Sequence, residues 1–502
     1  MTQSSIVLGV TTLVVGVVSI LGVLFARGQI ETVEDYISAR GSAGEGTLTA
    51  TLIASSMGAW ILLSPAEAGA AFGGITAVLG YALGSALPMV VYAVIGPRIR
   101  ELIPHGHSLT EYTHARYGTA MYVYVLVVSI AYMFTFLAAE MTGITGALSL
   151  VAGVPAWQTA ALIGGFVLVY TTYGGLRASI FTDTVQTLLI LPLLAIGFGF
   201  ALLELGGAGA VYEGAVSSNP QLLNLGFVSG IQFGVYIAVA VLGAEMLNQA
   251  WWQRIYAAEN DRVLQRSFLV TAVAIIPMIF VSGLFGLAAQ GLNLIDGNAS
   301  IAFFLVVDEA FPDSIVLGIV ILAVLLVMSS ADTLLNALSS IVTADLPRVL
   351  ELSDETLTAS ARALTVVVAL AAIVIGAQGY SVLAIFFTAD LLAVATFIPL
   401  LSGLYFARLS ETGALLASVA GLIVGGLFFP LARPLLPFAS GLPAASYFAS
   451  FLSAGIVSAA LTVLASLGSK GQFDFEQFEQ KIQRLDEHEP MADGSGQRGN
   501  DQ

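Results

Sequence analysis

The sequence predicts an all-α membrane protein that crosses the bilayer about thirteen times. Of its 502 residues, 57% are hydrophobic and only 10% are charged, and the mean hydropathy is +0.91. These values exclude an ordinary soluble domain. The apolar residues also gather in long runs of about 20 residues, the length of a helix that spans the hydrocarbon core.

Apolar runs separated by turn residues place the spans in order along the chain. The first run lacks the positive flank and small-residue cleavage site of a signal peptide, so we expect it to remain as a helix. The predicted spans are residues 5–25, 47–71, 77–96, 119–151, 157–173, 180–205, 230–252, 267–290, 314–346, 361–377, 381–406, 412–435 and 445–467.

The basic residues predict the orientation of these spans. Sixteen of the 17 Lys and Arg residues, Arg254 among them, fall on one predicted side, and only Arg433 falls on the other. Because cytoplasmic loops are rich in Lys and Arg, that side is predicted to be cytoplasmic. We therefore expect a multi-pass protein of the cell membrane with its amino terminus outside and its carboxyl terminus inside.

Charge and cysteine content exclude other kinds of partner. The net charge is −16, and much of it lies in the tail after residue 473, which makes nucleic-acid binding unlikely. The chain has no cysteine, so disulfides and thiolate metal sites are absent. The expected partners are the lipid bilayer, a small solute and an ion, while the oligomeric state stays open.

The run 320–347 carries a polar stripe inside an apolar span. Five polar residues recur at positions i, i+3, i+4, i+7 and i+11, which places them on one helical face. They are Ser329, Asp332, Thr333, Asn336 and Ser340. A polar group without partners costs several kcal/mol, roughly, in hydrocarbon, so this face should contact protein, water or an ion. A hydrogen-bond network between helices is the alternative.

Two spans, five apart in order, contain helix-weakening residues in mid-membrane. Span 47–71 holds the sequence SSMG at 55–58 and then Pro65, and span 230–252 holds Gly234 and Gly243 among polar residues. Unwound turns at matching places suggest inverted repeats with a binding site at the midplane. Gly and Pro are also common in ordinary transmembrane helices, so coincidence is the alternative.

Asp183 lies near the start of span 180–205, on one face with Gln186 and Thr187. One interpretation is an interfacial residue that caps a helix. The other pairs it across the core with Ser329 and Thr333 as an oxygen site. Carbonyls, hydroxyls and one carboxylate together suit an alkali cation.

Four ordered segments carry a resemblance to the sodium:solute symporter family. They are ASSMGAWILLSP at 54–65, TYGGLRASIFTDTVQTLLIL at 172–191, WWQRIYAAEN at 251–260 and SSADTLLNALSSIVTADLPR at 329–348. The resemblance implies the leucine-transporter-type fold of two inverted five-helix repeats, here 47–206 and 230–408. One extra helix at 1–26 precedes them, and two helices at 412–468 and an acidic tail at 469–502 follow.

The resemblance also implies a site for sodium, the expected cofactor. Its ligands would be the carbonyls of Ala54, Met57 and Leu326 and the hydroxyls of Ser329 and Ser330. Some members have a second sodium site, which would correspond here to Asp183, Ser329, Asp332 and Thr333. Asp332 replaces a hydroxyl of those members, which leaves the second ion open and a proton role possible.

The solute site implied by the resemblance lies beside the two broken spans. Trp60 resembles a tryptophan of the proline-transporting members, whereas Val241 and Glu245 replace aromatic residues. The candidate solute-binding residues are Trp60, Ser64, Glu67, Glu140, Val241, Glu245, Asn248, Gln249 and Phe387. The glutamates favour a cationic or donor-rich solute such as an amine or urea. Alternatively, they pair with neighbouring side chains.

Sodium-coupled symport of a small polar solute is the predicted function, with proton-coupled symport as the nearest alternative. A channel or a transporter-like sensor is the alternative from another class. An enzyme is not expected, because His105, His107 and His114 sit in a predicted solvated loop without a metal-binding pattern. The segment 473–485 is predicted to form an amphipathic helix at the membrane surface.

Overall fold

The computed structural model describes residues 3–27, 39–297, 299–349, 363, 366–368, 370–372, 374–376, 378 and 380–482. The described residues form helices joined by loops, and ten of these helices are long and apolar enough to cross a membrane. Two shorter apolar helices, Ala156–Leu168 and Val366–Gly376, coincide with predicted spans, and the second runs through residues outside the described set. The prediction of an all-α polytopic membrane protein is confirmed.

Several helices begin at a Ser or Asn cap, as at Ser108, Asn260 and Ser381. The helices are α1 (Gln3–Ala26), α3 (Glu45–Ser56), α4 (Trp60–Glu67), the π-helix η1 (Ala68–Gly73), α5 (Gly74–Leu102), α6 (Leu109–Arg116), α7 (Thr119–Ala152), α8 (Ala156–Glu204), α9 (Gly207–Ser218), η2 (Pro220–Leu223), α10 (Val228–Met246), α11 (Gln249–Ala257), α12 (Asp261–Gly291), η3 (Ala299–Ile301), α13 (Ala302–Ala310), α14 (Asp313–Val349), α16 (Val382–Ser402), α17 (Glu411–Phe428), η4 (Arg433–Leu435), η5 (Pro437–Ala439), α18 (Tyr447–Gly468) and α19 (Gln477–Lys481).

Two predicted spans are interrupted, and one long helical element contains two predicted spans. Span 47–71 is built from α3, α4 and η1, with a gap at residues 57–59, and span 230–252 is built from α10 and α11. Within α8, Gly175 has φ 54° and ψ −157°, which divides this element into two helices at the predicted boundary between spans 157–173 and 180–205. Glycine tolerates that positive φ, whereas most residues do not.

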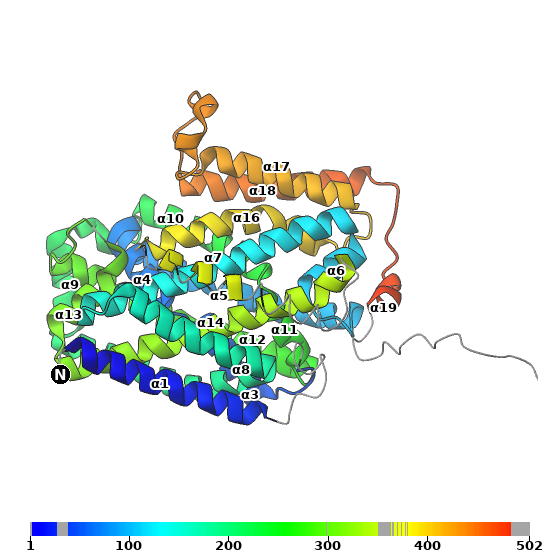
Figure 1. Cartoon of the computed structure of the whole chain (residues 1–502). Coiled ribbons are helices and arrows are strands. Elements are labelled where there is room, and N and C mark those ends of the chain that lie inside the picture. Colours follow the sequence, from blue (N-terminus) through cyan, green and yellow to red (C-terminus); the bar gives the residue numbers. More distant parts are fainter. Residues whose placement is uncertain are drawn as a thin grey trace, which may run out of the picture.

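The helices pack side by side in one bundle (Figure 1), in which α3 contacts α8, α12 and α14, and α10 contacts α5, α16 and α18. The predicted repeat 47–206 covers α3 to the end of α8, and the predicted repeat 230–408 runs from α10 past the end of α16. Helix α5 packs against α10 and α12, and α14 packs against α7 and α8, so helices from the two predicted repeats contact each other. Helix α1 covers α8 on one flank, while α17 and α18 cover α16 on the opposite flank.

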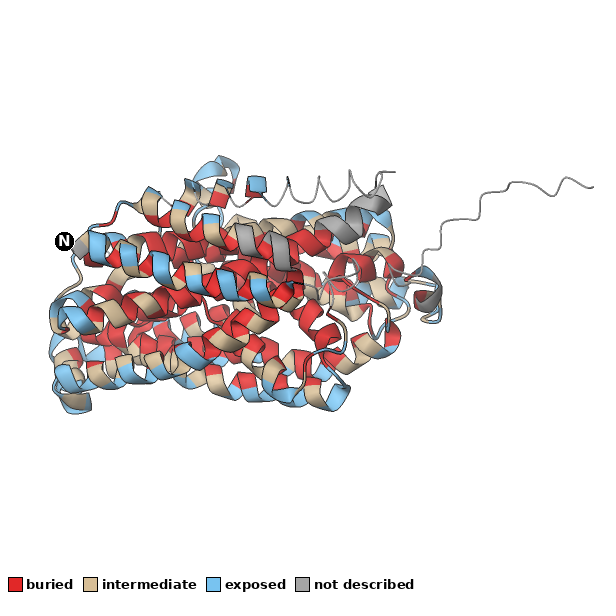
Figure 2. Cartoon of the chain, turned by 60° about the horizontal axis from the view of Figure 1, so that its bottom comes forward, coloured by how far each residue is buried: buried red, intermediate tan, exposed pale blue. Residues whose placement is uncertain are grey.

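Burial follows the pattern expected for a protein surrounded by lipid (Figure 2). Buried residues run through the middle of the bundle, whereas large apolar side chains point outward from its flanks. Leu13, Val94, Leu188 and Val273 are each more than 60% exposed in the isolated chain. An apolar outer surface of this extent requires hydrocarbon around it.

The carboxyl-terminal segment departs from the predicted surface helix. The described part contains only the five-residue α19, and Phe478 is fully buried against Tyr112 of α6, with 5.9 Å between ring centroids. The Lys481 ammonium donates to the Ala115 carbonyl oxygen at 3.1 Å. The segment therefore packs on the protein, because α6 offers an aromatic surface that hydropathy does not reveal. Residues 483–485 of the prediction lie outside the described residues.

We expect Phe478→Ala to release this segment from α6. Loss of a fully buried phenylalanine costs about 3–5 kcal/mol in a core, which exceeds what a short docked segment can retain. Trypsin should then cleave after Lys481 at least several times faster in detergent. Glu476→Ala, at an exposed position of the same segment, is the control and should leave cleavage unchanged. Equal cleavage rates for both variants would contradict the packing.

Candidate ion and solute site

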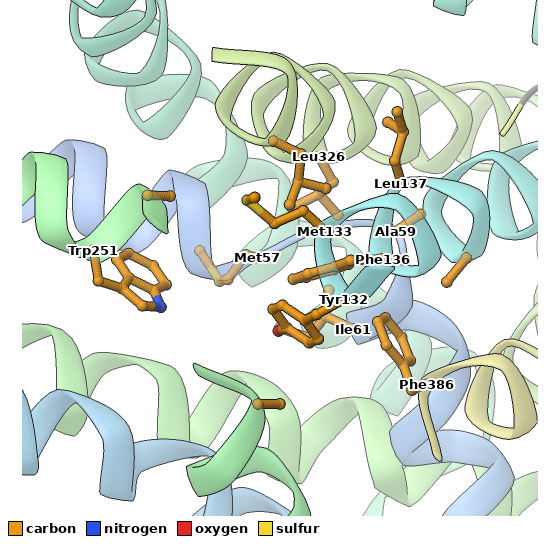
Figure 3. Packing of buried hydrophobic residues seen from close by; sticks show 14 of the residues in the cluster. Met57, Ala59, Ile61, Tyr132, Met133, Phe136, Leu137, Trp251, Leu326 and Phe386 are labelled. Carbon is orange, nitrogen blue, oxygen red and sulfur yellow. The ribbon is translucent and has the colours of Figure 1, made fainter. Parts of the chain in front are cut away.

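The gap between α3 and α4 is the structural centre of the site. Helix α3 ends at Ser56, and Met57 adopts an extended conformation with φ −115° and ψ 101°. Helix α4 starts at Trp60. Figure 3 shows Met57 and Ala59 close to the helix that carries Tyr132 and Phe136 and to Leu326 of α14. The sequence SSMG at 55–58 is helix-weak, which explains why the break occurs there.

The second break lies between α10 and α11. Helix α10 ends at Met246, and Asn248 caps α11 by accepting the Ala250 N–H through its Oδ1 at 3.0 Å. Spans 47–71 and 230–252 are therefore both divided in two, as the sequence predicted from their Gly and polar residues.

The predicted polar stripe on α14 faces protein. All five of its residues are buried, with 3% or less of each exposed. The Ser330 hydroxyl donates to the Leu326 carbonyl at 3.1 Å, and the Ser329 hydroxyl donates to Asp183 at 2.6 Å. Helix α3 packs on α14, and the Ser55 and Thr333 hydroxyl oxygens lie 3.0 Å apart. The five candidate sodium ligands thus come from α3, from the residue that follows it and from α14, which packs on α3.

Asp183 joins three helices through its carboxylate. Oδ2 accepts hydrogen bonds from Thr51 at 2.6 Å and Ser55 at 3.1 Å, both on α3, and Oδ1 accepts the one from Ser329. Asp183 is fully buried, eight residues beyond the break in α8 at Gly175. It is therefore a core residue that bridges helices, and the interpretation as an interfacial helix cap is wrong.

Arg254 is also part of this cluster, which the sequence analysis missed. It was counted among the cytoplasmic loop charges, yet its side chain is fully buried. Its Nη2 lies 3.2 Å from Asp183 Oδ2 and donates to Ser55 at 2.9 Å and to Thr333 at 3.0 Å. Arg262 and Arg266 follow Arg254 in the sequence, so Arg254 was predicted to lie in the same cytoplasmic loop. Only its contact with the buried Asp183 shows that Arg254 belongs to the core.

Asp332 faces the same side of α14 as Thr333. Its carboxylate accepts hydrogen bonds from Ser179 at 3.0 Å and Thr182 at 3.2 Å, both on α8. The candidate residues of the second sodium site, Asp183, Ser329, Asp332 and Thr333, therefore lie together. The Arg254 guanidinium already contacts two of them.

A small cavity lies next to the first break, at Trp60. Its volume is about 30 Å³, which leaves room for no more than one or two waters. The lining is mainly aromatic and aliphatic and contains two carboxylates. The lining residues are Trp60, Tyr81, Tyr132, Phe136, Ile237, Val241, Ala244, Glu245, Leu383, Phe386 and Asp390. Among the predicted solute residues, Trp60, Val241 and Glu245 are in this list.

The two carboxylates of the cavity differ in their surroundings. Glu245 accepts hydrogen bonds from Tyr132 at 3.1 Å, from Asn248 at 3.0 Å and from the Trp251 indole. Asp390 is 3% exposed, and within the described residues no side chain donates to it. A buried carboxylate without donors favours a cationic ligand. Asp390 was not among the solute-binding residues predicted from the sequence.

Several predicted solute residues contact other parts of the protein. Ser64 is fully buried on α4, and Glu67 accepts hydrogen bonds from Ser381, the cap of α16, at 3.0 and 3.2 Å. Phe387 packs on Tyr447 of α18, with 4.5 Å between ring centroids. Phe386 takes the position in the cavity, because neighbouring residues point about 100° apart on a helix.

Gln249 connects α11 to the loop before α6. Its Nε2 donates to the His107 carbonyl at 2.8 Å, and its Oε1 accepts the Leu109 N–H at 2.9 Å. His107 is only 3% exposed, with its Nδ1 3.1 Å from Glu111 Oε2, so the prediction of a solvated histidine is wrong there. The polar groups of a loop packed under α11 need partners, which explains this burial.

Glu140 lies on α7 and is fully buried. It is absent from the residues that line the cavity. Its Oε2 accepts the N–H of Ala59, in the gap between α3 and α4, at 2.7 Å. The alternative that the glutamates pair with neighbouring side chains therefore describes Glu67 and Glu245 in this conformation, whereas Glu140 bonds a backbone N–H.

The fold and sequence resemble those of known transporters. A sodium-coupled sialic acid symporter in an outward-open state is similar over 94% of this chain and 99% of its own, with a TM-score of 0.71 and 18% identity. A spermidine transporter of Candida albicans is 27% identical over 65% of this chain, and a probable urea transporter of Schizosaccharomyces pombe is 24% identical over 52%. The matches span 61% and 41% of the lengths of these two relatives.

A family model gives the wider relationship. The model of the sodium:solute symporter family matches residues 36–421, which include both repeats and all four segments that carried the resemblance. This chain belongs to the sodium:solute symporter family.

Proposed function

We propose that this protein is a sodium-coupled symporter that moves a small organic solute by alternating access. The observation that carries the proposal is the gap at residues 57–59, where an interrupted helix meets buried hydroxyls of α14 on one side and an aromatic cavity on the other. Broken helices that contact an ion site and a solute site together are typical of such transporters.

The proposed sodium ligands are the carbonyls of Ala54, Met57 and Leu326 and the hydroxyls of Ser329 and Ser330. The contact between α3 and α14 and the burial of both serines support this assignment. Sodium bound there would hold α3 against α14. Opening of the inner side would separate these helices and release the ion, so ion and solute would raise each other's affinity by the same factor.

We propose that only one sodium is used and that Arg254 takes the place of a second. The guanidinium lies between Asp183 and Thr333, so the positive charge that a second ion would supply is already part of the protein. A second cation beside it would meet like charge at short distance in a medium of low dielectric constant. The assignment of Asp183, Asp332 and Thr333 to an ion site is thereby replaced by an internal ion pair.

The solute is proposed to carry an ammonium group. Asp390 and Glu245 give the cavity negative charge, and the rings of Trp60, Tyr132 and Phe386 provide faces that attract cations. The relatives named as spermidine and urea transporters agree with an amine or a donor-rich solute. Proline fits less well, because the cavity offers its carboxylate two negative neighbours.

The chain is proposed to lie in the cell membrane with α6 and α19 on the cytoplasmic side. An inward sodium gradient would then drive accumulation, with about 2.3 kcal/mol for each charge moved through 100 mV. Proton coupling and a channel remain the competitors. Uptake of putrescine, spermidine, urea, proline, choline and glucose into proteoliposomes separates them. We expect amine uptake that is lost when choline replaces sodium at fixed pH, and uptake that needs only a pH gradient would overturn the proposal.

Ser329→Ala should raise the sodium concentration for half-maximal uptake about tenfold, because one ligand is lost. The solute concentration for half-maximal uptake at saturating sodium should change much less. Sodium-dependent uptake kinetics in proteoliposomes measure both values. Ser282→Ala, a buried serine on α12 that bonds the Ile61 carbonyl, is the control. An unchanged sodium dependence in Ser329→Ala would remove this serine from the ion site.

Arg254→Gln should destabilise the protein by about 3–5 kcal/mol, because it leaves Asp183 buried without its partner. The double variant Arg254→Gln/Asp183→Asn should recover a large part of this loss. Thermal unfolding in detergent measures the changes. Arg266→Gln breaks the exposed pair with Glu45, at 3.6 Å, and should cost no more than about 1 kcal/mol. Similar losses for Arg254→Gln and Arg266→Gln would argue against a buried ion pair.

Asp390→Asn should weaken uptake of an amine-bearing solute about tenfold or more, because a charge-assisted contact becomes a neutral one. The sodium concentration for half-maximal uptake should stay unchanged. Competition by unlabelled amines at saturating sodium gives the affinity. The same variant should discriminate less against uncharged solutes such as urea. If amine affinity survives in Asp390→Asn, the ammonium group binds elsewhere.

A further inference from the structure

Glu140 occupies a position that neither the solute cavity nor the ion pair explains. It comes from α7, far from both broken helices in the sequence, and its side chain is fully buried at the gap between α3 and α4. One carboxylate oxygen, Oε2, accepts the Ala59 N–H at 2.7 Å. That bond satisfies a backbone donor that the break in the helix leaves open.

The second oxygen, Oε1, occupies the space where a side chain at position 58 would begin. A Cβ atom built on Gly58 would be 2.0 Å from Oε1 and 2.5 Å from Oε2. No other residue fits at position 58 unless the carboxylate moves away. Gly58 is therefore required for the close contact between the Glu140 carboxylate and the backbone, and it also favours the break in the helix.

Oε1 is also short of partners. It is buried, and within the described residues it has no hydrogen-bond partner. A buried carboxylate with one oxygen unsatisfied is costly, whereas a cation beside it removes that cost. Within the described residues, the hydrogen bond from Ala59 to Oε2 is thus the only one whose geometry is well formed, while the Ser330 hydroxyl and the Trp60 N–H lie nearby.

The groups around Oε1 are those assigned to sodium. The Met57 carbonyl is joined directly to the Gly58 nitrogen, and the Ser330 side chain is close enough to interact with the Glu140 carboxyl. The other proposed ligands are all neutral carbonyls and hydroxyls. The Glu140 carboxylate would add a full negative charge to these neutral sodium ligands.

We propose that Glu140 is a sodium ligand, with Oε1 bound to the ion at the Met57–Ser330 site. This inference rests on the proposed function and adds a third helix, α7, to the two that hold the ion. It also makes the occupied site neutral, because the charge of the ion is balanced by the carboxylate. The membrane potential would then act mainly on the return of the empty carrier rather than on the loaded step.

The test is the sodium dependence of Glu140→Gln in the full-length protein. The amide oxygen of glutamine can still accept the Ala59 N–H, so the packing is kept and the charge is lost. We expect the sodium concentration for half-maximal uptake to rise about tenfold or more. Glu67→Gln removes the charge of another buried glutamate on the Ser381 side of α4 and should leave the sodium dependence unchanged.

A binding measurement covers the case in which Glu140→Gln no longer transports. Sodium that binds the folded protein raises its unfolding temperature relative to choline. This shift in detergent should be present in the unaltered protein and in Glu67→Gln, reduced in Glu140→Asp, and absent in Glu140→Gln. A full sodium-induced shift in Glu140→Gln would overturn the proposal.

Comparison with Ser329→Ala distinguishes a failure of the Glu140 proposal from a failure of the sodium site itself. If Ser329→Ala loses sodium affinity while Glu140→Gln keeps it, the ion site stands and Glu140 is only a structural acceptor for Ala59. If neither variant changes the sodium dependence, the proposed sodium site itself is wrong.

Discussion

The structure depends on one constraint, which is that a helix broken inside the bilayer exposes backbone groups with no water to satisfy them. Between Ser56 and Trp60 the chain leaves the helical conformation in the middle of the protein. Each unsatisfied N–H or carbonyl there costs several kcal/mol, roughly. The break persists because other helices supply partners, and Glu140 of α7 is one that takes the Ala59 N–H.

The break is held on its other side by a network of buried charge. Thr51 and Ser55 of α3 bond Asp183 of α8, and Arg254 of α11 bonds the same carboxylate. Helix α11 is the second half of the other broken helix. One half of each interrupted span, α3 and α11, is thus tied to the same aspartate, so a movement of either helix must disturb the pair.

The sequence predicted those parts of the site that depend on spacing along one helix. The stripe on α14 and the face of Asp183 follow from the 3.6-residue period, and both are buried toward each other. Arg254 could not be placed in the same way, because an arginine close to a basic loop resembles a cytoplasmic charge. Its burial depends on Asp183, 71 residues earlier in the sequence.

Other differences have equally specific causes. The sequence analysis predicted Phe387 in the cavity, whereas Phe386 lines it. Consecutive residues point about 100° apart on a helix, and two adjacent phenylalanines give no indication of which one faces the cavity. Gln249 was expected in the cavity but satisfies the loop at residues 107–109 instead. Which polar side chain supports a loop is a tertiary property that one sequence does not reveal.

The two proposed sites are separated by a single residue. Gly58 touches Glu140, Ala59 donates to it, and Trp60 lines the solute cavity. If sodium binds as proposed, a shift of the Gly58 backbone would reach Trp60 through two peptide units. Because the cavity is too small for a solute in this conformation, the lining must separate before solute enters. The backbone at residues 58–60 is the shortest connection by which the ion can favour that separation.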